Sequence, residues 1–84
     1  MNKILITIHV LFTGEEYDMF VPIGLKVSNV IELIQKTVNE LDNEHYIIKA
    51  NDTVKLFDEH GNVINENNIV KFSGLKNGSK VVLI

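Results

Sequence analysis

The residues most able to do acid–base chemistry lie next to one another in the segment Asp58-Glu59-His60. A carboxylate beside an imidazole can act as a general acid–base pair when a pocket shifts the pKa values of both groups. Gly61 and Asn62 follow directly, and both residue types favour turns. We therefore predict an exposed hairpin tip from Asp58 to Asn62, without a pocket, and we assign no catalytic residue to it.

Metal and cofactor sites are not expected either. The three histidines, His9, His45 and His60, have no spacing that suits a shared metal ion. The chain has no cysteine, which excludes disulfides, thiolate zinc sites and cysteine nucleophiles. Neither a calcium-binding loop nor a glycine pattern for phosphate is present. We predict no enzymatic activity, no metal and no cofactor.

Composition limits the class of protein further. The 84 residues suit one domain, which we place at residues 1–84. The formal net charge of −3 disfavours a nucleic-acid binder or a polybasic membrane anchor, because both need a basic surface. No segment has the roughly 18 apolar residues that span a bilayer, and the N-terminal segment lacks the cleavage site of a signal peptide. We expect a cytoplasmic protein without membrane insertion.

The N-terminal part of the chain alternates in hydrophobicity with a period of two, which predicts strands. From Lys3 to Phe12, one face is uniformly apolar and should point at the core. A turn at Gly14 leads to a second predicted strand, Tyr17–Val21, which Pro22 ends because proline cannot donate to a sheet. The two strands should form an antiparallel hairpin. The apolar face comprises Ile4, Ile6, Ile8, Val10 and Phe12.

The period then changes to three and four, which predicts an amphipathic helix of about four turns from Val27 to Leu41. Its start has no clear capping residue; Lys26 and Ser28 lie nearby. The next segment, Asp42–Thr53, is either a loop or a short strand, held to the core by Tyr46, Ile47 and Ile48. The predicted core stripe of the helix comprises Val27, Val30, Ile31, Ile34, Val38 and Leu41.

The C-terminal part is expected to complete the sheet. A hairpin over 54–64 precedes a polar connection, and Ser79–Ile84 forms the last strand, with Val81 and Leu83 facing the core. The first and last strands are the most apolar, so they should lie centrally and pair. A helix must cross one face of the sheet to bury its stripe. The result is an α+β fold of the β-grasp type: a mixed sheet of four to five strands packed on one amphipathic helix. The connection should point these side chains inward: Ile69, Val70, Phe72 and Leu75.

These elements resemble the ubiquitin superfamily, in the hairpin, the helix "VSNVIELIQ", the strand "VKLF" and the closing "GLKNGSKVVLI". Within it, the chain is similar to the YukD/EsaB family, small ubiquitin-like proteins of Gram-positive type VII secretion systems. That similarity lies in "TVKLFDEHGNVI" and "LKNGSKVVLI" and leaves Asp42–Thr53 unmatched. It implies a cytosolic accessory or regulatory component of the secretion apparatus, without catalytic activity.

Covalent carrier function is the sharpest alternative within the superfamily. Conjugation and sulfur transfer both need a flexible C-terminal Gly-Gly that an enzyme can reach, whereas this chain ends "VVLI". If Ile84 is the natural terminus, we expect a non-conjugating protein, and a C-terminally modified carrier is the least favoured reading. Gly74 and Gly78 are expected in turns with positive φ.

The outer face of the sheet is the predicted partner surface. If Val81 faces the helix, then Val82 faces outward, and an outward apolar group is more than scattered surface residues would give. In ubiquitin-like proteins this face is the usual docking surface, so we expect a protein of the secretion system as partner. The alternatives that stay open are a homodimer contact, a misread strand parity or coverage by the Asp42–Thr53 loop, and a stand-alone adaptor unrelated to secretion. The predicted partner-binding residues are Leu5, His9, Leu11, Lys55, Val82 and Ile84.

Overall fold

The computed structural model of the chain describes residues 2–11, 13–41 and 54–84. Phe12 and the segment Asp42–Thr53 lie outside the described residues, as does the side chain of Leu41, so the predictions made for them stay predictions. The described elements are β1 (Lys3–Val10), β2 (Glu15–Pro22), α1 (Val27–Leu41), β3 (Leu56–Asp58), the 3₁₀ helix η1 (Val70–Phe72) and β4 (Ser79–Leu83).

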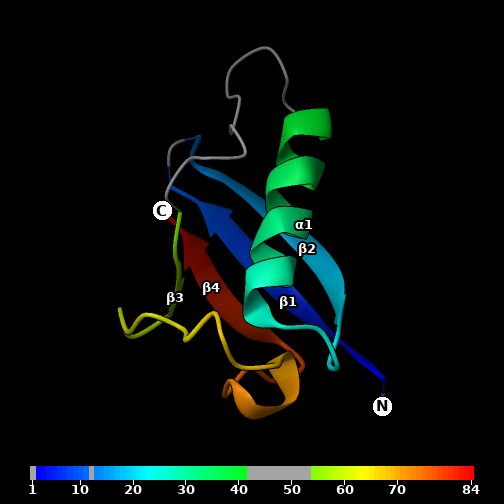
Figure 1. The fold of residues 1–84 in the computed structure, drawn as a ribbon. Coiled ribbons are helices and arrows are strands. Elements are labelled where there is room, and N and C mark those ends of the chain that lie inside the picture. Colours follow the sequence, from blue (N-terminus) through cyan, green and yellow to red (C-terminus); the bar gives the residue numbers. More distant parts are fainter. Residues whose placement is uncertain (1, 12, 42–53) are drawn as a thin grey trace.

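The four strands form one mixed sheet in the order β2-β1-β4-β3, and α1 lies across one of its faces (Figure 1). β1 pairs antiparallel with β2 and parallel with β4, while β3 pairs antiparallel with β4. The first and last strands therefore occupy the centre, as predicted. The mixed sheet packed on one helix confirms the β-grasp architecture.

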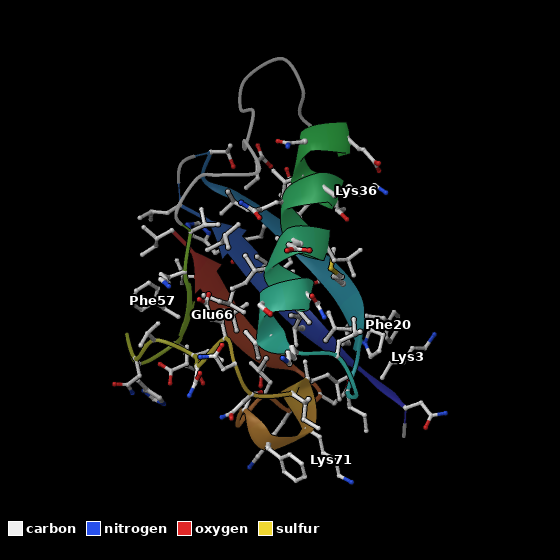
Figure 2. All side chains as sticks on the ribbon, viewed as in Figure 1. Lys3, Phe20, Lys36, Phe57, Glu66 and Lys71 are labelled. Atoms are coloured by element: carbon white, nitrogen blue, oxygen red, sulfur yellow. The ribbon has the colours of Figure 1, made fainter. Side chains whose placement is uncertain are left out.

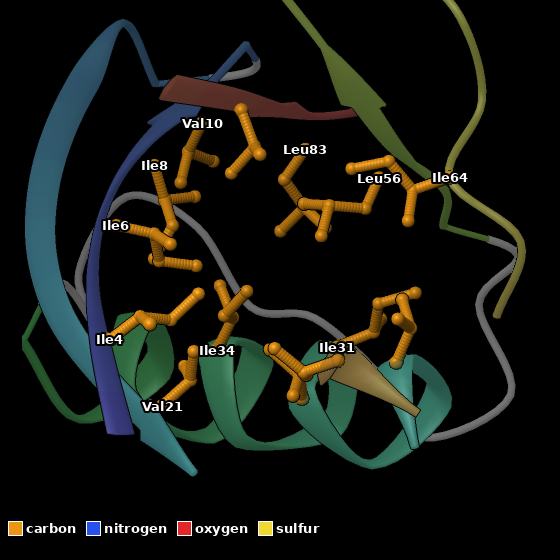
Figure 3. Close-up of a cluster of buried hydrophobic side chains, with 14 of the residues drawn as sticks. Ile4, Ile6, Ile8, Val10, Val21, Ile31, Ile34, Leu56, Ile64 and Leu83 are labelled. Atoms are coloured by element: carbon orange, nitrogen blue, oxygen red, sulfur yellow. The ribbon is translucent and has the colours of Figure 1, made fainter. Parts of the chain in front are cut away.

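The core fills the space between the sheet and α1. Strand β1 buries alternate residues, because successive side chains point to opposite faces of a sheet. Val81 and Leu83 are buried from β4, so the predicted strand parity is confirmed. The helix stripe is confirmed for Val27, Val30, Ile31, Ile34 and Val38. These side chains belong to one cluster with Leu56 and Ile64, of which Figure 3 labels Ile31 and Ile34 from the helix.

Backbone groups from a distant part of the chain cap the start of α1. The N–H of Val27 donates to the carbonyl oxygen of Asn68 at 2.9 Å, and the N–H of Ser28 donates to that of Glu66 at 3.0 Å. The first N–H groups of a helix have no partner within it and need one elsewhere. Carbonyls supply that partner here, which explains why the sequence shows no clear capping side chain.

The connection between β3 and β4 differs in one respect from the prediction. Val70 is buried, but Phe72 is 70% exposed, and its ring lies 5.7 Å from the Lys71 ammonium group. Both belong to η1, where successive residues are rotated by about a third of a turn, so a single turn presents only one side chain to the core. The predicted inward position of Phe72 is therefore wrong. Leu75 is partly buried and packs against the core, as expected.

Two further local predictions can be compared with the structure. Gly74 and Gly78 have φ values of 92° and 89°, which confirms the turns. Strand β2 is longer than predicted and includes Pro22 as its last residue, a position where a missing N–H is tolerated. The described residues contain no helix long and apolar enough to cross a membrane.

Candidate docking surface

The face of the sheet opposite α1 carries the side chains that alternate with the core residues. We call it the open face. The register places His9 beside Glu16 on one side and beside Val82 on the other, and Val82 beside Phe57. None of these four side chains is fully buried. The open face is therefore accessible along a row that crosses all four strands.

Five apolar side chains gather at one end of this face. Leu11 and Val63 are 53% and 57% exposed, and groups of exposed apolar residues are uncommon on small soluble domains. The backbone pairs Phe57 with Val63, and Ile84 exchanges two hydrogen bonds with Lys55. Cross-strand partners point to the same face, so these side chains lie together. We define the open-face patch as Leu11, Phe57, Val63, Val82 and Ile84.

The structure brings together five of the six residues predicted to bind a partner. His9 and Lys55 border the open-face patch, and three others belong to it. Leu5 does not, because it lies four residues before His9 on β1, or about 13 Å along the strand, with Thr7 and its neighbour Lys80 in between. Leu5 therefore shares the open face with the others, as expected, but lies apart from them. The binding role of the residues stays a prediction.

Sequence reasoning missed two members of the patch, Phe57 and Val63. The signal for Phe57 was present: it follows Lys55 by two positions, and residues two apart in a strand share a face. Val63 has no such signal, because it lies outside the described strands and meets Phe57 through a single isolated bridge.

Polar contacts surround the patch without covering it. The Nδ1 atom of His9 lies 3.9 Å from a carboxylate oxygen of Glu16, and the Lys55 ammonium group lies 3.3 Å from that of Glu66. Each of these pairs is partly exposed to solvent, where an ion pair contributes about 0–1 kcal/mol. Both pairs therefore lie at the border of the open-face patch and not among its members.

The predicted hairpin tip is present and follows the turn chemistry. Asp58 Oδ1 accepts hydrogen bonds from the backbone N–H groups of His60 and Asn62, each at 2.9 Å. The Asn62 N–H is the main reason that the pKa of Asp58 is lowered, and the His60 N–H adds to it. A depression of about 340 Å³ lies between this tip and Lys76 and Lys80, so the expectation of a tip without a pocket is wrong. Among the described residues, no group of His, Cys, Asp or Glu could hold a metal ion.

The lowered pKa of Asp58 gives a prediction about acid stability. Its folded-state pKa lies below the unfolded value of about 3.9. The carboxylate therefore stabilises the fold above that value, and this contribution is lost as the pH falls through the folded-state pKa. We expect the melting temperatures of the wild type and of Asp58→Ala to differ at neutral pH and to converge below about pH 4. The measurement is a series of thermal melts at different pH values. A difference in melting temperature between the two proteins that stays constant with pH would contradict this role of Asp58.

Comparison with known proteins agrees with the fold described above. No family model and no curated protein matches the sequence, but solved structures match over the whole chain. The EccD5 ubiquitin-like domain from Mycobacterium xenopi has a TM-score of 0.82 at 15% identity, and the match covers 100% of this chain and 94% of that one. The chain has the ubiquitin-like fold. The ubiquitin-like domain of EccD1, from the type VII secretion system of Mycobacterium tuberculosis, has a TM-score of 0.74 at 13% identity, with coverage of 100% and 99%.

A third similar structure is much larger. A chain of the ESX-5 inner membrane complex has a TM-score of 0.82 at 12% identity; the match covers 100% of this ubiquitin-like chain and 21% of that chain. Identities this low establish the fold, and a fold of this kind hosts many unrelated functions. Function must therefore be argued from the surface.

Proposed function

We propose that this ubiquitin-like chain is a non-conjugating, non-enzymatic accessory component of a Gram-positive type VII secretion system. It acts in the cytoplasm by protein–protein contact through the open face of the sheet. The observation that carries the proposal is the open-face patch: five neighbouring apolar side chains outside the core, two of them more than half exposed. Contiguous exposed apolar groups on small soluble domains mark interaction sites.

Two lines of support connect this surface to secretion. The sequence resembles the YukD/EsaB family, and the folds of two secretion-system domains match the chain over its whole length. A phenylalanine ring on the patch, Phe57, suits a partner pocket, since aromatic residues are enriched at the energetic centres of interfaces. The polar border at His9 and Lys55 would then form the polar rim that such interfaces have.

The test is capture of the partner from the native host with an affinity-tagged full chain. Membrane components of the secretion system should co-purify from solubilised membranes. Val82→Glu should reduce their recovery about tenfold or more, because a charge in the apolar centre stays unpaired. Leu33→Glu is the matched control: it places the same charge on an exposed leucine of α1, on the other side of the sheet, and should leave recovery unchanged.

Secretion itself provides the second readout. Deleting the gene should lower the export of the system's substrates, and the Val82→Glu chain should fail to restore it. Unchanged export together with no recovered secretion component would overturn the proposal. A change in molecular mass on Val82→Glu, measured by sedimentation, would instead point to the homodimer contact.

A further inference from the structure

Among the described strands, β2 forms an edge of the sheet, with one side of its backbone open for pairing. In an antiparallel pair, opposite residues alternate between exchanging hydrogen bonds and facing away from each other. Leu5 of β1 bonds toward the β4 side: its N–H donates to Asn77 and its carbonyl accepts from Gly78. Its partner on β2 is Phe20, so this pair exchanges no hydrogen bonds. The backbone N–H and C=O groups of Phe20 therefore point away from the sheet.

The same alternation fixes the neighbouring positions. Leu11, which directly follows β1, also bonds toward β4 through its N–H to the Leu83 carbonyl, so the backbone groups of the odd-numbered residues of β1 face β4 throughout. Their partners on β2 expose their backbone groups at the edge. The outward-facing positions of β2 are Glu16, Asp18 and Phe20.

The opposite edge of the sheet is not available in this way. Beside β3, the Asp58 N–H donates to the Asn62 carbonyl, and the Ile64 N–H donates to the Leu56 carbonyl. The chain thus folds back and pairs with its own β3. Within the described residues, β2 is the long strand with a free side, and exposed edges of this kind accept a further strand.

We infer that β2 is a second binding site, which accepts an extended segment of another protein with basic and apolar residues in alternation. Residues of such a segment that pair with Glu16 and Asp18 would lie on the open face beside two carboxylates, where opposite charges stabilise cross-strand pairs. The residues between them would point toward the α1 side, against Tyr17 and Met19, which pack on the core but are only half-buried. The bound segment would therefore carry basic residues on the face beside the two carboxylates and apolar residues on the face toward α1.

The same charges argue against self-association at this edge. Strand β2 carries Glu15, Glu16 and Asp18 and no basic residue. A second copy of β2 would bring like charges together across the new pair, which is destabilising. The occupant is therefore a different, basic segment. This inference does not rest on the proposed secretion role, since β2 forms one edge of the sheet, whereas the open-face patch is centred on β4 and β3 toward the other edge.

The test uses a short synthetic peptide of alternating lysine and valine, with a glutamate–valine peptide as the control. Titrated into the full chain and followed by NMR, the basic peptide should shift the amide signals of Glu16, Asp18 and Phe20 and slow their hydrogen exchange. Binding should weaken as salt is added. The acidic peptide should cause no shift.

Two variants separate backbone pairing from charge. Asp18→Pro removes an N–H that points outward, so the β1–β2 ladder stays intact, and we expect peptide affinity to fall about tenfold or more. Asp18→Asn keeps the N–H and removes the charge, and should weaken binding by a smaller, salt-dependent factor. The inference is overturned if Asp18→Asn binds as the wild type does at low salt, if a folded Asp18→Pro retains full affinity, or if the shifts fall on Phe57 and Val82 instead.

Discussion

Val81→Glu is expected to unfold the domain, whereas Val82→Glu, one position later, should leave it folded. Val81 is 1% exposed and points at α1, so glutamate there would bury an unpaired carboxylate at a cost of several kcal/mol. Single domains have only about 5–15 kcal/mol of stability in total. Val82 lies half-buried on the open face, where a carboxylate reaches water.

Circular dichroism with a urea titration distinguishes the two variants. Val82→Glu should keep a cooperative transition near that of the wild type, and Val81→Glu should lack one. A folded Val81→Glu beside an unfolded Val82→Glu would show that the faces of β4 are exchanged. Because Val82 also belongs to the open-face patch, its folded variant is the one to use in partner capture.

Ile34→Ala is expected to cost about 2–4 kcal/mol, the range for truncating a large side chain in a packed core. Ile34 is 0% exposed at the middle of α1 and lies within the cluster that joins the helix to β1 (Figure 3). Its neighbour Leu33 is 38% exposed and provides the matched control. Leu33→Ala should cost less than about 1 kcal/mol, as surface substitutions do.

Urea unfolding with a common m-value gives both free energies of unfolding. Similar losses for the two variants would contradict the assignment of a buried stripe to one side of α1. A larger loss for Leu33→Ala than for Ile34→Ala would show that Leu33, and not Ile34, lies on the face of α1 that contacts the sheet.

The sequence predicts the main elements well because their hydrophobic patterns extend over many residues. Alternation along β1 fixes which side chains face α1, and the structure agrees at every described position. The spacing of three and four between apolar residues in α1 likewise predicts which of its side chains face the sheet. The pairing of the first and last strands followed from their apolar character alone, since the most apolar strands belong in the centre of a sheet.

The rest could not be predicted, because it depends on contacts between distant segments. The carbonyls of Glu66 and Asn68 that cap α1 are backbone groups, which carry no residue-specific signal. Phe72 is exposed because of the rotation within one short 3₁₀ turn, which hydropathy does not encode. Lys3 lies beside the exposed ring of Phe20, 5.0 Å from its centre (Figure 2), and this contact also depends on strand register.

The central place of β4 has a consequence for the newly made chain. β1 is synthesised first among the described strands and β4 last, yet the two lie side by side. At roughly 5–20 residues per second, the ribosome needs on the order of several seconds to make the chain between them. During that time the inner edge of β1, from Leu5 to His9, has no β4 to pair with. The sheet can be completed only after Leu83 emerges, so the β1–β2 hairpin exists without its β4 partner until then.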